Sequence, residues 1–186
     1  LASGRQMLRH LRNPQLVATY AVGFGVLFNF IATFTFISFR LAAPPYNLSP
    51  TLLGVIFVTY LTGTAATPLT GRFVGRFGRR NFVLLAIGIW LCGIALTLLG
   101  PMWIILVGLS ISACCGMLCQ AVSTGHVAIT AQAGRSSAVG LYVTSFYIGG
   151  SLGAAIGGVA WISGGWPACV AMIAAMLTIM GTIVTL

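Results

Sequence analysis

Long apolar runs, separated by short polar stretches or by glycine and proline, dominate this chain of 186 residues. A helix needs about 20 mostly apolar residues to cross a bilayer. The runs are long enough for this, and they are too continuously apolar for the alternating segments of about ten residues that build a membrane barrel. The pattern predicts an all-α membrane protein with six transmembrane helices, at about residues 14–39, 49–70, 81–99, 102–125, 138–162 and 166–186.

The residues at the ends of these runs favour the same division. Ser49 suits the N-cap of a helix, and Pro50 suits its first turn, where the missing N–H would be unpaired in any case. The Gly-Gly pair at 164–165 provides a turn between the last two runs. We therefore expect residues 14–186 to form one bundle, preceded by a polar and basic segment at residues 1–13.

The charged residues are nine arginines, and the chain contains no Asp or Glu. Only 5% of the residues are charged, 59% are hydrophobic and the mean hydropathy is +1.06, so lipid must surround most of the surface. Six spans leave Arg40 alone on one side of the membrane, where it could attract anions or contact lipid phosphates. The other arginines share the opposite side with both chain ends, which predicts cytoplasmic termini. These arginines are Arg5, Arg9, Arg12, Arg72, Arg76, Arg79, Arg80 and Arg135.

The missing carboxylates also exclude much chemistry, including a Ser-His-Asp triad and a carboxylate metal site. The five cysteines are odd in number and have no CxxC spacing, so they are interpreted as packing residues. We predict no enzyme activity, no cofactor and no metal. A net charge of +9 is also typical of proteins that bind nucleic acid, but membrane topology accounts for these arginines, so no nucleic acid partner is predicted.

The most specific motif is GRFVGRFGRR at residues 71–80, between the second and third predicted spans. It resembles the motif G-x-x-x-D-R-x-G-R-[RK] of the major facilitator superfamily, which lies between the second and third helices of each six-helix half. Gly75 stands where the family has the Asp whose charge helps to latch the cytoplasmic side. The alternative is an ordinary basic loop that contains glycines. The residues assigned to the motif are Gly71, Arg72, Gly75, Arg76, Gly78, Arg79 and Arg80.

Three further stretches extend this resemblance over essentially the whole chain: FTFISFR (34–40), TYLTGTAATPLTGR (59–72) and LYVTSFYIGGSLGAAIGGVAW (141–161). They resemble the second half of YnfM-like inner-membrane efflux transporters of the superfamily. The resemblance implies the last six helices of a twelve-helix transporter in a bacterial inner membrane. It makes residues 1–13 the end of a cytoplasmic linker, and the missing N-terminal six-helix half a partner.

The function that the resemblance implies is secondary active transport. Two halves rock about a midplane site, which opens alternately to each side and exports a small molecule, driven by protons. This half has no carboxylate to carry a proton, so the carrier would lie in the other half or be His126. The isolated chain is therefore not expected to transport.

Polar and aromatic side chains within the spans are candidates for the substrate cavity, because polar groups in lipid are costly and often functional. The resemblance implies that the first, second, fourth and fifth spans line the cavity and that the third and sixth face lipid. The alternative for each candidate is a contact between helices of the bundle, where a hydrogen bond contributes about 0.6–2 kcal/mol. The predicted cavity residues are Asn29, Phe36, Tyr60, Gln120, Tyr142 and Ser145.

The fifth span carries a stripe of small residues, Gly149, Gly153 and Gly157. Small residues four positions apart let helix backbones approach closely in lipid. Two interpretations remain open: static packing, and a contact with a helix of the other half that changes between transport states.

Two other classes of protein remain as alternatives. A self-assembling pore or scaffold would use two copies of the six-helix chain to supply the cavity. An intramembrane enzyme would need Cys119 or His126 as its nucleophile, and this is the weaker alternative because the helix that carries Cys119 is expected to end before His126.

Overall fold

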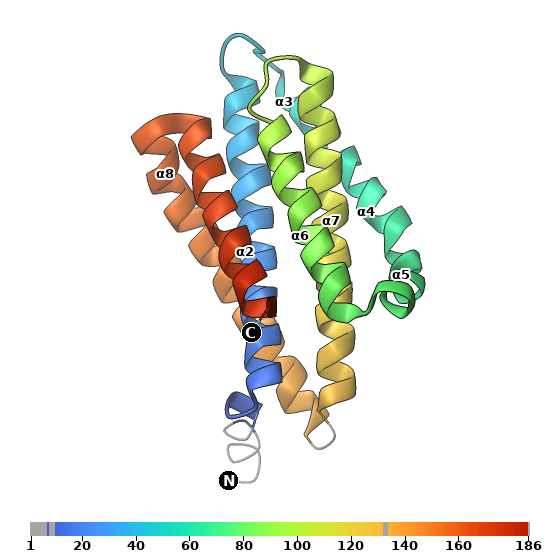
Figure 1. Cartoon of the computed structure of the whole chain (residues 1–186). Helices are drawn as coiled ribbons and strands as arrows, with labels where there is room; N and C mark the ends of the chain where they lie inside the picture. The colour runs from blue at the N-terminus through green and yellow to red at the C-terminus, as the bar shows by residue number, and fades with distance from the viewer. Residues whose placement is uncertain (1–6, 8–9, 132–133, 186) are drawn as a thin grey trace.

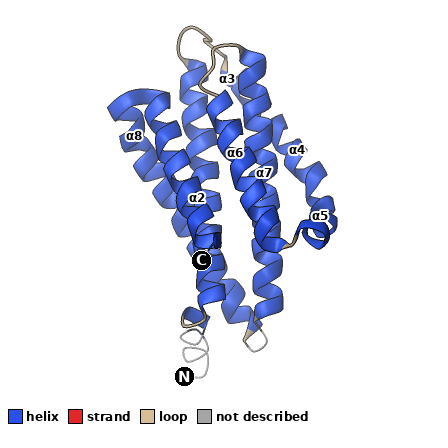
Figure 2. Ribbon diagram, viewed as in Figure 1, coloured by secondary structure: helices blue, strands red, loops and turns tan. Residues whose placement is uncertain are grey.

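The computed structural model describes residues 7, 10–131 and 134–185, which are almost entirely helical and contain no strand (Figures 1 and 2). Five of their helices are long and apolar enough to cross a membrane: α2 (Pro14–Ala42), the segmented helix Pro50–Phe77, α6 (Arg79–Leu96), α7 (Met102–Thr130) and α8 (Arg135–Thr185). The 51-residue α8 reverses at Gly164 and Gly165, where the backbone is not helical. The described residues therefore form six apolar rods, as the sequence predicts.

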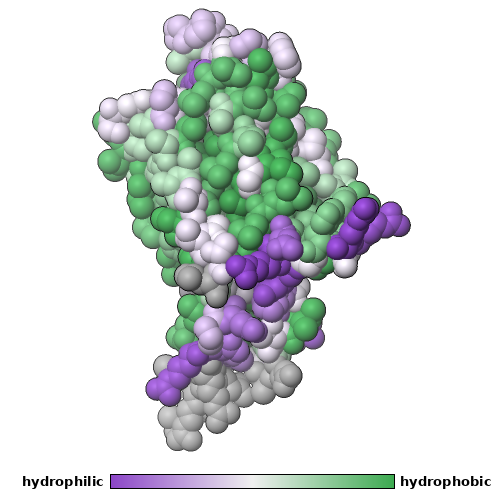
Figure 3. All heavy atoms as spheres, in the orientation of Figure 1, coloured by the Kyte–Doolittle hydropathy of each residue, from purple (hydrophilic) through white to green (hydrophobic). Residues whose placement is uncertain are grey.

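The connections between rods fall at two opposite ends of the bundle (Figure 1). One end holds the α2–α3 and α6–α7 loops, the reversal of α8, and Arg40 in the last turn of α2. The other end, here called the arginine end, holds the turns before α6 and α8 and both ends of the described chain. A hydrophobic band separates the two ends (Figure 3). The described arginines at the arginine end are Arg12, Arg72, Arg76, Arg79, Arg80 and Arg135; Arg5 and Arg9 lie outside the described residues.

The second rod is a series of short helices. Its elements are α3 (Pro50–Ile56), η1 (Phe57–Thr59), α4 (Tyr60–Ala66), η2 (Thr67–Leu69) and α5 (Thr70–Phe77). The Ser49 hydroxyl accepts a hydrogen bond from the Leu52 N–H and caps α3. The second interruption coincides with Pro68, which has no N–H to donate.

Threonine hydroxyls satisfy backbone carbonyls around both interruptions. They donate over 2.6–2.7 Å to carbonyls three or four residues earlier, which keeps these polar groups paired within an apolar span. The interruptions are therefore compatible with a membrane-spanning rod. The donors are Thr59, Thr62, Thr67 and Thr70.

The loop that the sequence predicts over residues 71–80 is mostly helical. α5 continues the second rod to Phe77, and only Gly78, with φ of +75°, separates it from α6. The spacing of four residues between Phe73 and Phe77 permits a helix despite the glycines, and the Phe73 ring stacks on Phe82 of α6 with centroids 5.9 Å apart. The structure also extends the fourth rod to Thr130, beyond the predicted end at residue 125, and begins the fifth rod at Arg135.

The core lies between α2, α6, α7 and α8. α2 packs against α8 and α7, and α6 packs against α7 and α8. Trp90 of α6, Leu109 of α7 and Ile173 of α8 are fully buried where these helices meet. The second rod stands outside this core and packs mainly on α7 through α4.

The glycine stripe of α8 packs against α2 of the same bundle. A Cβ atom on Gly149 would overlap the carbonyl of Phe24, and one on Gly153 would overlap the carbonyl of Phe28. Gly157 lies against the ring of Phe36. The backbones of the two helices therefore touch, and α2 covers these glycines in this arrangement. A contact that changes between transport states stays a prediction.

Candidate functional site

Two uncovered flanks of the bundle carry large apolar side chains. They are the second rod and the first segment of α8, and the described residues contain no extensive packing contact between the two. In a membrane such a surface faces either lipid or another helix. Its exposed residues are Leu52, Val55, Phe57, Val58, Leu61, Leu69, Phe73 and Phe77 on the second rod, and Val143, Tyr147, Ile148, Leu152, Ile156, Val159 and Ile162 on α8.

Tyr60 lies at the inner edge of the first flank, within an aromatic cluster. Its ring contacts Phe34 of α2 edge-on with centroids 4.5 Å apart, and lies 4.9 Å from Phe30 and 5.3 Å from Phe57. Phe30 in turn touches α7 at Gly116. Tyr60 is half-buried, so the cluster joins three rods while part of the Tyr60 side chain stays accessible.

Gln120 and Ser145 are also partly accessible. Gln120 lies on α7, one turn after Gly116, and its side chain makes no hydrogen bond to the described residues. Ser145 lies on α8 and donates a hydrogen bond of 3.0 Å to the carbonyl of Tyr20 on α2. Tyr60, Gln120 and Ser145 thus come from three different rods, and each keeps some surface outside the bundle.

The other three predicted cavity residues are enclosed by the bundle itself. Asn29 is fully buried and its amide N–H donates to the sulfur of Met180 over 3.4 Å, while its Oδ1 has no partner among the described residues. Phe36 packs between Gly157 and Trp161. Tyr142 is inserted against Gly23 of α2. The structure does not bring these three together with Tyr60, and their role in a cavity stays a prediction.

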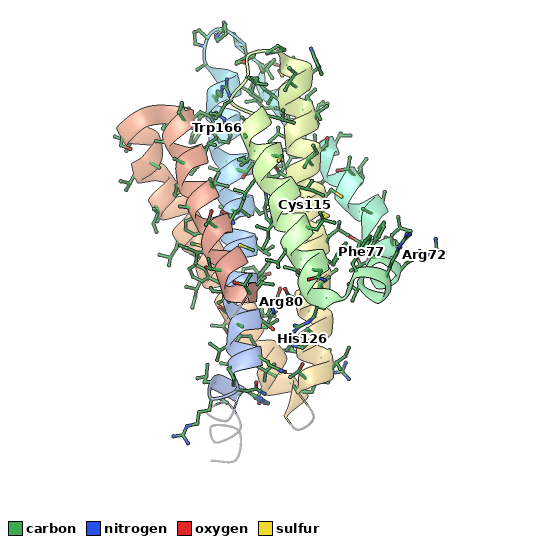
Figure 4. The ribbon with its side chains drawn as sticks, in the orientation of Figure 1. Arg72, Phe77, Arg80, Cys115, His126 and Trp166 are labelled. Atoms are coloured by element: carbon green, nitrogen blue, oxygen red, sulfur yellow. The ribbon has the colours of Figure 1, made fainter. Side chains whose placement is uncertain are left out.

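The motif residues form the turn at the arginine end (Figure 4). Arg72 and Arg76 are exposed on α5, and the Arg76 guanidinium lies 5.7 Å from the centroid of the Phe77 ring. Arg80, in the first turn of α6, donates a hydrogen bond of 2.6 Å to the carbonyl of Thr185. It thereby ties the start of α6 to the end of α8, and a cation suits that position because helix C-termini carry partial negative charge.

Arg40 has a role that sequence reasoning missed. Its guanidinium donates to the carbonyls of Thr97, Leu98 and Leu99, the last over 3.4 Å, and so caps the end of α6. The Trp166 indole N–H reaches the same Thr97 carbonyl over 3.2 Å. Neither expected role, anion attraction or contact with lipid phosphate, is needed to explain this arginine. The sequence shows Arg40 as a lone cation on its side of the membrane, but the helix end that it caps lies 57 positions away in the chain.

His126 lies within the last turns of α7, at the arginine end (Figure 4). Its ring is half-buried and within 3.2 Å of the Thr130 hydroxyl one turn later. α7 includes both Cys119 and His126, but Cys119 is fully buried, so no accessible nucleophile pair is formed.

The helical bundle and its uncovered flanks can now be compared with known proteins. The sequence profile of the Major Facilitator Superfamily matches residues 19–186. The chain belongs to the major facilitator superfamily. The superfamily match accounts for the apolar rods and for the position of the 71–80 motif between the second and third of them.

The curated relatives are transporters, and all are much longer than this chain. The inner membrane transport protein YnfM of Escherichia coli is 32% identical over 170 residues, which are 91% of this chain and 41% of YnfM. An uncharacterized transporter of Buchnera aphidicola (subspecies Schizaphis graminum) is 29% identical over 84% of this chain and 38% of its own length. The MFS-type transporter YybF of Bacillus subtilis is 27% identical over 95% of this chain and 44% of its own length. The chain thus spans about two fifths of the relatives that it matches.

Proposed function

We propose that this chain is the C-terminal half of a secondary active transporter that exports a small molecule by alternating access. The observation that carries the proposal is the partial match: nearly the whole chain aligns with only 41% of a membrane transport protein. The uncovered flanks support it, because a six-helix half must leave an apolar surface for its other half. Residues 1–13 end the linker between the halves in this proposal.

The proposal places the substrate between the two halves, in contact with Tyr60, Gln120 and Ser145. These side chains offer an aromatic face, an amide and a hydroxyl, and no charge. A neutral or amphipathic molecule suits them best. Asn29, Phe36 and Tyr142 would join the cavity only after α2 and α8 rearrange. Protons are the proposed driving ion, with the carrier in the other half or at His126.

The proposed location is the bacterial inner membrane, with both chain ends in the cytoplasm. The gathering of arginine at one end of the bundle supports this orientation. Labelling of single cysteines with a membrane-impermeant maleimide tests it. Arg76→Cys should react only from the cytoplasmic side, and Tyr46→Cys should react only from outside; the opposite pattern would invert the proposed topology.

Photo-cross-linking in the full-length protein tests the proposed half. A benzophenone maleimide on Leu61→Cys, in a background with Cys92 replaced by Ala, should label peptides outside this chain, because Leu61 is 62% exposed on the flank. The matched control is Ile94→Cys, which is 1% exposed and should stay unlabelled. Cross-links from the Leu61→Cys variant only to lipid would contradict the proposal.

A pore made of two copies remains the second candidate, because the same flanks could pair with a second chain. The purified chain is placed in vesicles of bacterial lipids, which shrink when ribitol is added outside and recover their volume as ribitol enters. If the chain is half of a transporter, these vesicles should recover at the same rate as protein-free vesicles. Faster ribitol entry, together with a symmetric cross-link of Leu61→Cys to itself, would favour the pore.

A further inference from the structure

A cavity of about 440 Å³ opens at the arginine end, between α2, α6, α7 and the last turn of α8. Its polar lining consists of Arg79 and Arg80 from α6, Gln15 and Thr19 from α2, and Ser123 from α7. Ile183 of α8 forms part of its apolar wall. None of the residues assigned to the substrate cavity lines this cavity, whereas Ser145 lines the apolar groove beside it.

The electrostatics of this cavity favour an anion. Two arginines line it, and the sequence has no carboxylate that could neutralise them. The start of α6 adds to the positive potential, because its N-cap residue is Gly78 and no side chain caps its first N–H groups. The hydrogen bond from Arg80 to the Thr185 carbonyl fixes one guanidinium at the cavity wall without cancelling its charge.

An apolar groove of about 540 Å³ lies beside the cavity, between α2 and both segments of α8. Ile183 lines the groove as well as the cavity, so the two are neighbours. Val17 and Phe24 from α2 and Met176 and Ile179 from α8 line the groove. It runs from the arginine end along the apolar surface of the bundle, where hydrocarbon is the surrounding solvent.

We propose that the cavity and the groove together bind one anionic phospholipid. The phosphate lies against Arg79 and Arg80, and one acyl chain lies along the groove beyond Ile183. Basic pockets between transmembrane helices are suited to anionic headgroups. The shared chemistry is a phosphate group, and the groove favours a lipid over a free phosphate as its source. The proposal depends on a membrane-spanning bundle and not on the direction or substrate of transport.

Native mass spectrometry of the delipidated protein in detergent tests this proposal, with phosphatidylglycerol or phosphatidylcholine added back. Phosphatidylglycerol should be retained, and the double variant Arg79→Gln/Arg80→Gln should weaken its binding about tenfold or more. The matched control is Arg72→Gln/Arg76→Gln, which removes two exposed arginines of α5 and should leave binding unchanged. Equal losses in both double variants, or equal retention of phosphatidylcholine, would overturn the proposal.

Two further arms separate fold from site and lipid from free phosphate. Arg79→Gln alone leaves the Arg80–Thr185 bond intact, and should weaken lipid binding without a change in melting temperature. Ile179→Trp fills the groove and leaves both arginines in place, so it should also weaken phosphatidylglycerol binding. If glycerol phosphate displaces the lipid at equal concentration, or if Ile179→Trp has no effect, the acyl groove is not used and the lipid assignment fails.

Discussion

α2 and the second rod are equally suited to cross a membrane, yet they occupy opposite environments within the bundle. Among the most apolar 18 residues of each, 61% are buried in α2 and only 17% in the rod Pro50–Phe77. α2 is a single helix of 29 residues, while the second rod is divided by two 3₁₀ segments. Hydropathy therefore identifies a rod, but not its place in the bundle.

The difference arises from the residues that each rod meets. The glycines of α8 let its backbone reach the carbonyls of Phe24 and Phe28 on α2. The second rod packs mainly on α7, where Gly63 lies against the carbonyl of Ala113 and Thr62 donates to the carbonyl of Ser110 over 3.0 Å. One-sided packing leaves its other face free for a partner.

The largest effect is expected from a side chain inserted between α8 and α2. Gly149→Ala places a methyl group on the Phe24 carbonyl, and a clash with backbone cannot be relieved by a rotamer change. We expect a loss of about 1–3 kcal/mol or more of stability, measured as a lower melting temperature in detergent. Gly158→Ala is the matched control, because a Cβ there meets nothing within 4 Å. Equal stability of the two variants would show that α2 is not held as described.

A second prediction concerns the end of α2. Arg40→Gln removes the charged donor to three carbonyls at the end of α6, and should cost about 1–2 kcal/mol. Arg72→Gln removes an exposed arginine that makes no hydrogen bond to the described residues, and should leave the melting temperature unchanged. If Arg40→Gln is as stable as Arg72→Gln, the cap contributes nothing.

A smaller effect is expected at Asn29, the polar centre of α2. Among the described residues, its only side-chain hydrogen bond is to a methionine sulfur, and its Oδ1 has no partner. Asn29→Leu should therefore change stability by about 1 kcal/mol or less. Transport by the full-length protein should be measured on the same variant, because lost transport at normal stability would assign Asn29 to function. A large loss of stability would contradict the present account of its contacts.

The smallest effect is expected on the second rod. Leu61→Ser changes a side chain that is 62% exposed, and should alter the stability of the isolated chain by less than about 0.5 kcal/mol. Leu109→Ser, at a fully buried leucine of α7, is the control and should be strongly destabilising. A large effect of Leu61→Ser on the isolated chain would mean that the rod is already covered.

The number of rods and the family could be predicted from the sequence, because apolar length and the 71–80 motif are local properties. The contact of Arg40 with the end of α6 could not, since it joins residues 57 positions apart that no local pattern connects. The spacing of the α8 glycines indicated a close contact, but α2 as the partner is a property of the whole bundle. The helical form of α5 was missed because two glycines outweighed the spacing of its aromatic residues.

The candidate site was predictable only in part, for a related physical reason. A polar or aromatic residue inside a span is equally expected at a cavity and at a contact between helices. Tyr60, Gln120 and Ser145 keep accessible surface, whereas Asn29, Phe36 and Tyr142 do not. Which face of a helix is covered depends on its neighbours, and residue type alone carries no information about them.

The interruptions η1 and η2 divide the second rod into three helical segments, α3, α4 and α5. Threonine hydroxyls pair with carbonyls at both interruptions, so a bend there need not leave these polar groups unpaired in hydrocarbon. A change in tilt at α3 need not be transmitted to α5 and the arginines it carries. A partner that shifts α3 at one membrane surface would therefore leave α5 at the other surface in place.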